Sequence, residues 1–476
     1  MAAPIIAEPD EGEAALGARL DALGSSRRLW MLIGLISLGG VFEFYDLMMT
    51  AYVSPGLVKA GLFHLGRTGL FGQSDQASFA SATFLGFFVG ALFVARVADR
   101  FGRRSVFTFA LISYALATLV MATRQTAVGI DLWRMISGVG MGVELVTIDA
   151  YVSELAPARL RGRAFALNQA VQFCAVPIVA GLAWLLIPRT PLGVAGWRWV
   201  MAIGAIGALA AWAIRARLPE SPRWLARQGR LAEAEAIIAG LEGAGPAPPR
   251  RVDRSPSTPL ARRSETREGE TGAGEARLGE IFAPPYRRRT LMLVVFNIAQ
   301  AIGFYGFGNW APTLIASRGH SVVSSLAYAA AIALAFPLSP LLGVLLADRF
   351  ERKHLIMAAA LITATAGLAF SHQSAPATII ALGVVLTASN NLLSFAFHAY
   401  QAELYPTEIR AAAVGFVYAW SRLSTVASSY IIAALLQGFG AGGVFAFIAG
   451  AMAVVVASVG LFGPRTSRLN LDRTSH

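Results

Sequence analysis

Apolar blocks of about 20 residues recur along this chain of 476 residues, and they constrain its fold more than any motif does. A helix of that length crosses the roughly 30 Å hydrocarbon core of a bilayer. The blocks predict membrane helices at residues 29–52, 76–96, 105–123, 130–152, 164–187, 197–214, 290–315, 322–346, 355–370, 377–400, 411–436 and 444–462. We therefore expect an all-α membrane protein with twelve transmembrane helices.

Charge is sparse and clustered, which excludes several classes of protein. Charged residues make up 14% of the chain, against about a quarter in soluble proteins. The formal net charge of +12 comes from arginine clusters between the apolar blocks, as in topology signals, and a basic stripe for nucleic acid is lacking. A single cysteine, Cys174, excludes an internal disulfide and a cysteine-based metal site. The sequence also lacks a nucleophile–base arrangement or a phosphate loop, so we do not expect an enzyme.

The arginine clusters also predict the orientation in the membrane. Most of them fall on one set of intervening segments, which should be cytoplasmic. Both termini then lie in the cytoplasm, and the membrane is a plasma membrane, in a bacterium the inner one. The acidic N-terminus lacks the basic and apolar regions of a cleavable signal.

The longest polar stretch, 218–289, divides the chain into two halves. Its middle is rich in Pro, Gly, Ser and Arg and is predicted to be disordered. Before that part, Ser221-Pro222 predicts an N-cap followed by a first-turn proline, and the next 16 residues predict one or two short amphipathic helices. The expected organisation is a tail at 1–28, a bundle at 29–217, this linker, a bundle at 290–463 and a tail at 464–476.

Two cytoplasmic motifs occur once in each half. ADRFGRR at 98–104 recurs as ADRFERK at 347–353, and ELAPARLR at 154–161 recurs as ELYPTEIR at 403–410. Both pairs are separated by the same offset of 249 residues, which indicates an internal duplication of six-helix units.

The charges of these motifs predict a cytoplasmic gate, in which ion pairs hold helices in one state and break as the halves rock. The alternative is that they only anchor the topology. The predicted gate residues are Asp99, Arg100, Arg103, Arg104, Glu154, Arg161, Arg163, Glu220, Arg223, Asp348, Arg349, Arg352, Glu403 and Arg410.

Ionisable residues inside the predicted helices form a second group. Each costs about 2.5–3.5 kcal/mol at the bilayer centre and usually marks a function. They are Glu43, Asp46, Arg134, Glu144, Asp149, His398 and Arg422. At the offset of 249, Asp46 corresponds to Val295, Arg134 to Gly383 and Arg422 to Phe173. Charges without a duplicate are expected to serve one asymmetric substrate.

The motifs together resemble the major facilitator superfamily. ADRFGRR and ADRFERK are similar to its signature loops after the second and eighth helices, and PESPRWL at 219–225 is similar to a signature of its sugar porter and organic-ion branches. The glycine-rich stretch before Glu144 is similar to metabolite:proton symporters. The resemblance implies two pseudo-symmetric six-helix bundles around a polar cavity, working as a monomer without an obligatory protein partner.

The resemblance also implies a proton-coupling pair. In sugar porters, GGxxFGYD ends on a proton-titrating Asp that pairs with an Arg on the fourth helix; here GGVFEFYD ends on Asp46 and RMISGVGMG begins with Arg134. The alternative is a permanent structural ion pair. Gly138 and Gly142 share the face of Arg134, and such small residues let a neighbouring helix approach. Glu43, on the face of Asp46, and Glu144 are further candidates for proton coupling or for packing. The proton is the only expected coupling ion, with no cofactor or metal.

Polar and aromatic residues on several helices predict the substrate site. They are Tyr45, Gln169, Gln172, Asn297, Gln300, Phe304, Tyr305, Asn391, Ser394, His398 and Arg422. Gln169 and Gln300 match sugar-binding glutamines of the sugar porters. Ala299, Tyr305 and His398 stand where those porters carry a glutamine, an asparagine and a tryptophan, which argues against a hexose.

Arg422 favours an anionic substrate, because a lone arginine in a membrane helix needs a negative partner. That partner is a substrate carboxylate or a resident Glu43, Glu144 or Asp149. The leading hypothesis is a proton-coupled symporter of a small organic anion, with the lipid bilayer and the small molecule as the only partners. The alternatives are an organic-cation or drug:proton antiporter, a sugar:proton symporter and a membrane sensor that transports nothing.

Overall fold

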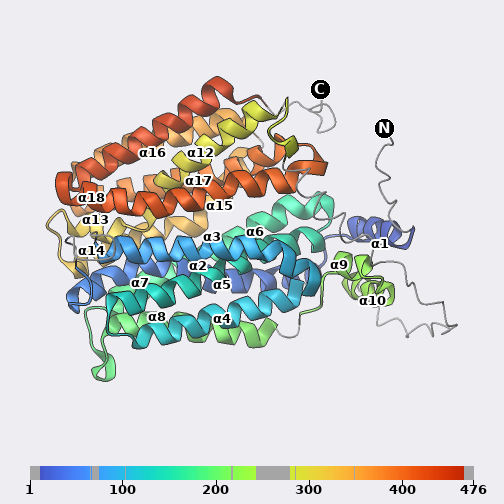
Figure 1. The fold of residues 1–476 in the computed structure, drawn as a ribbon, viewed down its shortest axis with the longest axis horizontal. Coiled ribbons are helices and arrows are strands. Elements are labelled where there is room, and N and C mark those ends of the chain that lie inside the picture. Colours follow the sequence, from blue (N-terminus) through green and yellow to red (C-terminus); the bar gives the residue numbers. More distant parts are fainter. Residues whose placement is uncertain are drawn as a thin grey trace.

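The computed structural model describes residues 11–64, 66, 74–101, 103–215, 218–242, 279–284, 286–347 and 349–465. Within these ranges every regular element is helical. Figure 1 shows two groups of long helices side by side along the longest axis, the blue-to-green first half and the yellow-to-red second half. Seven helical spans among the described residues are long and apolar enough to cross a membrane. Each of the twelve predicted segments falls in helical residues, whole or with a short break.

The first half contains six of the predicted membrane segments. Its helices are α2 (Arg27–Lys59), α3 (Asp75–Phe101), α4 (Arg103–Thr123), α5 (Ala127–Leu155), α6 (Arg161–Phe173), α7 (Ala175–Leu186) and α8 (Gly196–Arg215), with short 3-10 turns η2 (Ala158–Leu160) and η3 (Pro191–Gly193). The fifth predicted segment is divided at Cys174. Pro177 explains the break, because a proline has no N–H for the carbonyl four residues before it and its ring crowds that carbonyl.

The second half repeats this plan. Its helices are α12 (Arg287–Gly308), α13 (Ala311–Ala316), α14 (Val322–Ala333), α15 (Ala335–Ala347), α16 (Arg352–Ser371), α17 (Pro376–Glu403) and α18 (Thr407–Phe462). Pro337 accounts for the break at Leu334 in the same way. The helix α18 spans the last two predicted segments, and Gly440 at φ 63° separates them, a conformation that glycine adopts readily.

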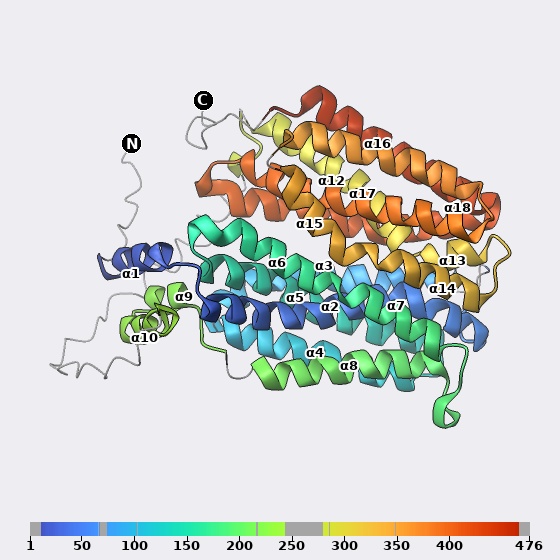
Figure 2. The ribbon, with the colours of Figure 1, turned by 180° about the vertical axis from the view of Figure 1, so that it is seen from behind.

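Three short helices gather at one end of the bundle (Figures 1 and 2). The predicted linker helices are α9 (Pro222–Arg227) and α10 (Leu231–Glu242), and Ser221 caps α9 by accepting from the Trp224 amide at 3.2 Å. The third, α1 (Glu11–Ala22), lies in the stretch that the sequence predicted only as a tail. The predicted disordered middle of the linker, 243–276, lies outside the described residues.

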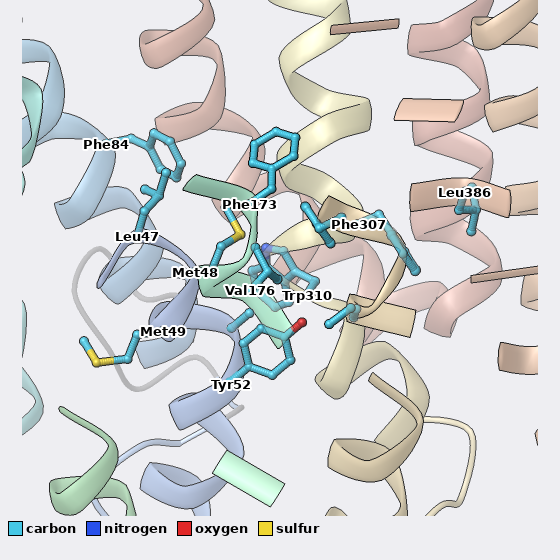
Figure 3. Close-up of a cluster of buried hydrophobic side chains, with 14 of the residues drawn as sticks. Leu47, Met48, Met49, Tyr52, Phe84, Phe173, Val176, Phe307, Trp310 and Leu386 are labelled. Carbon is cyan, nitrogen blue, oxygen red and sulfur yellow. The ribbon is translucent and has the colours of Figure 1, made fainter. Parts of the chain in front are cut away.

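The two halves share one apolar core. Figure 3 shows Met48 and Tyr52 of α2 beside Phe173, Val176 and Trp310, and all belong to the same buried cluster. Helix α3 contacts α18, α7 contacts α14 and α6 contacts α15.

Two hydrogen bonds cross between the halves at the end of the bundle opposite α1, α9 and α10. The Ser81 hydroxyl donates to the Val426 carbonyl, and the Thr313 hydroxyl donates to Gln76 Oε1, each at 3.0 Å. The halves therefore meet through polar contacts at this end, which is the outer end in the predicted orientation.

Candidate functional site

Asp46 and Arg134 form a buried ion pair in the first half. Arg134 NH1 donates to Asp46 Oδ2 at 2.9 Å, and the two side chains are 0% and 5% exposed. They come from the middle of α2 and the N-terminal third of α5. The structure thus brings together the two residues predicted for proton coupling.

Hydroxyl groups hold the carboxylate of this pair. Thr118 of α4 donates to Asp46 Oδ1 at 3.0 Å, and Ser137 of α5 donates to Oδ2 at 2.8 Å. Both oxygens therefore accept hydrogen bonds, as a buried charge requires.

The guanidinium has partners besides the carboxylate. Arg134 NH2 donates to the Asp46 carbonyl and to the Thr50 hydroxyl, both at 2.6 Å, and Nε donates to the Thr83 hydroxyl at 2.8 Å. Arg134 would keep these three hydrogen bonds if the carboxylate were neutralised.

Glycines set the distance between α3 and α5 at this site. A Cβ on Gly138 would lie 2.5 Å from the Thr83 carbonyl, and one on Gly86 would lie 2.1 Å from the Met135 carbonyl. Gly142 is in the same close contact, 2.2 Å from the Phe87 carbonyl. The close approach predicted for Gly138 and Gly142 is confirmed, and its partner is α3.

Arg422 of α18 occupies a second buried site, between the halves. Its NH1 donates to the Tyr305 hydroxyl at 2.7 Å and its NH2 to the Tyr418 hydroxyl at 3.2 Å. The guanidinium carbon lies 4.2 Å from the ring centre of Phe87, in the first half. Tyr305 also packs against Phe84, with ring centres 4.5 Å apart. Both halves therefore contribute to this site.

Two of the remaining intramembrane charges, Glu43 and His398, interact with Arg422 at longer range. Glu43 and Glu144 are fully buried, and the charge of Glu43 acts on Arg422. His398 and Asp149 are exposed. The His398 ring lies 5.3 Å from that of Tyr418, and its Nδ1 is 2.6 Å from the Ser394 carbonyl.

Some predicted substrate residues have structural contacts instead. The Tyr45 hydroxyl donates to the Val200 carbonyl at 2.8 Å, and its ring lies against Gly204 of α8. Asn297 Nδ2 donates to the Leu293 carbonyl of its own helix.

The other predicted substrate residues differ in their contacts and burial. Asn391 joins α17 to α15 through the Ser339 hydroxyl at 3.2 Å. Gln172 is buried against Gly40 of α2. Gln169 is half-buried, Gln300 is buried, and Phe304 is in ring contact with Tyr305 at 4.9 Å.

The described part of the predicted gate lies on the side of α9 and α10. Arg352 Nε is 3.5 Å from Glu403 Oε1, which joins the two motifs of the second half. Arg223 pairs with Asp21 of α1 at 2.9 Å, and Glu220 accepts from the Ser221 amide. The rest lie as follows: Arg410 Nε donates to the Tyr405 carbonyl, Glu154 is buried, Arg161 is half-buried, and Arg163 and Arg349 are exposed. The side chains of Asp99, Arg100, Arg103 and Arg104, and the whole of Asp348, lie outside the described residues.

Sequence reasoning missed several side chains of both sites. Thr50 lies four residues after Asp46, and Tyr418 lies four residues before Arg422, so helical spacing could have found them. Thr83, Phe87 and Thr118 come from α3 and α4, and no local pattern links them to their partners. In the described part of the chain, no group of three or more His, Cys, Asp or Glu side chains could hold a metal ion.

The chain is similar in sequence and in fold to known proteins. A family model described as sugar (and other) transporter matches residues 32–475. A Bacillus subtilis protein named for metabolite transport, YyaJ, is 30% identical over 449 residues, which are 94% of this chain and 95% of YyaJ. The niacin transporter NiaP of Acinetobacter baylyi is 26% identical over 458 residues, 96% of this chain and 99% of NiaP. The xylose transporter XylE from E. coli, solved in a partially occluded inward open conformation, has a TM-score of 0.72 at 19% identity and covers 94% of this chain and 100% of its own.

Proposed function

The chain belongs to the sugar (and other) transporter family, and we propose that it moves a small organic anion across the membrane together with protons. Membership confirms the predicted resemblance to the major facilitator superfamily, a group of multi-pass membrane transporters. The favoured substrate is an aromatic carboxylate, carried by alternating access. We place both termini in the cytoplasm, at the inner membrane of a bacterium.

The observation that carries the proposal is the set of contacts around Arg422. Its two terminal nitrogens donate to neutral phenols, and hydroxyl groups accept hydrogen bonds without neutralising the charge. Arginine presents a planar fork that binds a carboxylate through two parallel hydrogen bonds. A substrate carboxylate that displaced the phenols would gain two charge-assisted hydrogen bonds at a site shared by both halves.

The rings around Arg422 support an aromatic substrate. The guanidinium lies over the rings of Phe87, Tyr305 and Tyr418, which belong to α3, α12 and α18, and Phe84 packs against Tyr305. Such rings favour offset or edge contacts with another aromatic ring. The relative NiaP is named for niacin, an aromatic carboxylate.

The ion pair of Asp46 and Arg134 supplies the proton step of the proposal. An anion that crosses alone opposes the membrane potential by about 2.3 kcal/mol per charge per 100 mV. Protonation of Asp46 removes the attraction to Arg134, while the guanidinium keeps its bonds to Thr50 and Thr83.

Helix α3 connects this ion pair to the anion site. Thr83 holds Arg134, Phe84 contacts Tyr305 and Phe87 lies under Arg422. A shift of α3 that follows protonation would therefore reach the substrate.

The test uses proteoliposomes with an imposed pH gradient and three labelled probes: niacin, xylose and a quaternary ammonium ion. We expect niacin uptake to be accompanied by proton movement. Proton movement driven by xylose but not by niacin would establish the sugar symporter instead, and exchange of protons for the ammonium ion would establish the cation antiporter.

Variants separate the two sites. Arg422→Ala should weaken niacin binding about tenfold to a hundredfold, since a hydrogen bond to a charged group contributes about 1.5–3 kcal/mol. Arg422→Lys keeps the charge but loses the planar fork, so its niacin affinity should lie between those of the wild-type protein and Arg422→Ala. The matched control is Arg318→Ala, at an exposed arginine beyond α13. Asp46→Asn should keep exchange of labelled for unlabelled niacin and lose accumulation driven by the gradient.

A further inference from the structure

A buried pair of acidic residues lies away from the two sites described above. Asp75 begins α3 and Asp131 lies in the second turn of α5, at the end of the bundle opposite α1, α9 and α10. Each is 5% exposed. The proposed proton step does not use either of them.

The two carboxylates differ in their hydrogen bonds. Asp75 Oδ2 accepts from the His64 backbone amide at 2.7 Å and lies 3.3 Å from His64 Nδ1. Its place in the first turn of α3 also favours a negative charge. Asp131 Oδ1 is buried and has no hydrogen-bond donor among the described residues. The two groups are near enough for their charges to repel each other.

The other charged groups at this end have different partners. Arg134, one turn along α5, is bonded to Asp46, Thr50 and Thr83. Arg124, at the end of α4, donates to the Val120 carbonyl, and Arg198 of α8 donates to the Ala122 carbonyl. Lys59 is exposed at the end of α2. The ionised form of Asp131 is therefore buried beside one negative charge without a cation bonded to it among the described residues.

The same turn of α3 closes against the second half. Gln76 follows Asp75, is 1% exposed and accepts from the Thr313 hydroxyl of α13 at 3.0 Å. Its Nε2 is buried without a hydrogen-bond partner in the described part of the chain. Separation of the halves at this end would break the Gln76–Thr313 contact and admit water to the turn that carries Asp75.

We propose that Asp131, with Asp75 beside it, is a proton-binding site that senses the outer solution. When the outer end closes, the Asp131 carboxylate takes a proton from the external water and becomes a neutral acid, because burial of a second negative charge without a donor is costly. When the outer end opens, the proton returns to the same water. It does not cross the membrane. External acidity therefore favours the state that is closed outside.

This inference rests on the alternating access of the proposed function and is independent of the substrate. It also separates two proton sites: Asp46 for coupling and Asp131 for the position of the outer gate. Because binding of protons and closure are linked, each favours the other by the same factor.

The experiment measures the distance between the halves at the outer end. Cys174 is replaced by Ser, and spin labels are attached at Leu192→Cys and Ser374→Cys, which are exposed in outer loops of the first and second half. Distance distributions are recorded in nanodiscs from mildly acidic to mildly alkaline pH. An Asp46→Asn background removes the coupling site.

In this background we expect acid to increase the closed population. Asp131→Asn should abolish that response and hold the outer end closed at every pH, whereas Asp131→Glu should keep the response. His64→Gln is the matched control, because it replaces the ring beside Asp75 with a neutral side chain, and it should leave the response in place. A protonated carboxyl band in the infrared spectrum that disappears in Asp131→Asn would provide support independent of the labels.

The outcomes distinguish this inference from the proposed function. If niacin changes the distances but the acid response survives in Asp131→Asn, the proton site is wrong and alternating access stands. If the labels move with neither niacin nor pH in any variant, alternating access fails and the proton site fails with it.

Discussion

At the scale of single residues, the Asp46–Arg134 pair combines a buried charge with a nearly complete set of hydrogen bonds. The hydroxyl groups of four other residues form hydrogen bonds to it: Thr50, Thr83, Thr118 and Ser137. Truncation of one partner of such a pair strands a buried charge and costs about 3–5 kcal/mol. Neutralisation of both charges at once costs less, since no unpaired charge remains.

Stability should therefore respond unequally to changes in this pair. Arg134→Ala should lower the free energy of unfolding by about 3–5 kcal/mol, and adding Asp46→Asn to it should recover part of that loss. Unfolding followed in detergent by intrinsic fluorescence measures both. A loss in the double variant that equals the sum of the losses in Arg134→Ala and Asp46→Asn would show that the two charges do not interact.

At the scale of elements, close packing of α3 on α5 positions Thr83 for Arg134. The Thr83 carbonyl oxygen lies 2.5 Å from the position that a Cβ on residue Gly138 would occupy. A backbone carbonyl cannot move aside as a flexible side chain can, so the helices must separate to admit even a methyl group.

Gly138→Ala should destabilise the protein and disturb the ion pair at the same time. The expected cost is about 1–3 kcal/mol, as for other overpacked sites, together with reduced gradient-driven uptake. The control is Gly34→Ala in α2, where no atom lies within 4 Å of the added Cβ; it should be neutral or slightly stabilising. If Gly138→Ala has as little effect on stability and uptake as Gly34→Ala, the close packing of α3 on α5 does not set the geometry of the ion pair.

Helix α1 is a second element with a defined role, since it attaches the linker helices to the first half. Leu16, Leu20 and Leu23 are buried in a small core that includes residues of α5, α9 and α10. Arg19 Nε donates to Glu242 Oε1 at 2.7 Å, and this hydrogen bond lowers the pKa of the Glu242 carboxyl.

The attachment of α1 should depend on Leu20 and on pH. A lowered pKa means that the Glu242 contribution is present above the ordinary glutamate pKa of about 4.3 and is lost as the pH falls through the lowered value. Leu20→Asp should release α1 at every pH, and Ala18→Asp, on the exposed face, should not. Cleavage of the 11–26 segment by an acid-tolerant protease reports release, and equal cleavage of the two variants would contradict the packing.

At the scale of the whole molecule, the sequence predicted the helices and the duplication because these depend on hydrophobic length and on repeated motifs. The break points at Cys174 and Leu334 were missed although Pro177 and Pro337 were visible. Tyr45 was predicted to face the substrate. Because adjacent residues point to different faces of a helix, Tyr45 faces away from Asp46 and its hydroxyl donates to the Val200 carbonyl. The partners Thr83 and Thr118 depend on how separate helices pack, which no local pattern encodes.

The duplication leads to the last prediction. Arg352 and Glu403 pair at 3.5 Å in the second half, and the offset of 249 maps them to Arg103 and Glu154 in the first. If the pairs stabilise one transport state, Arg352→Glu should lower the initial rate of uptake by a few-fold, because a partly exposed ion pair contributes up to about 1 kcal/mol. The exchanged pair Arg352→Glu with Glu403→Arg should restore the rate, and the same exchange at Arg103 and Glu154 should do so in the first half. Rates that stay low in both exchanged pairs would show that pairing between these charges does not set the rate of uptake.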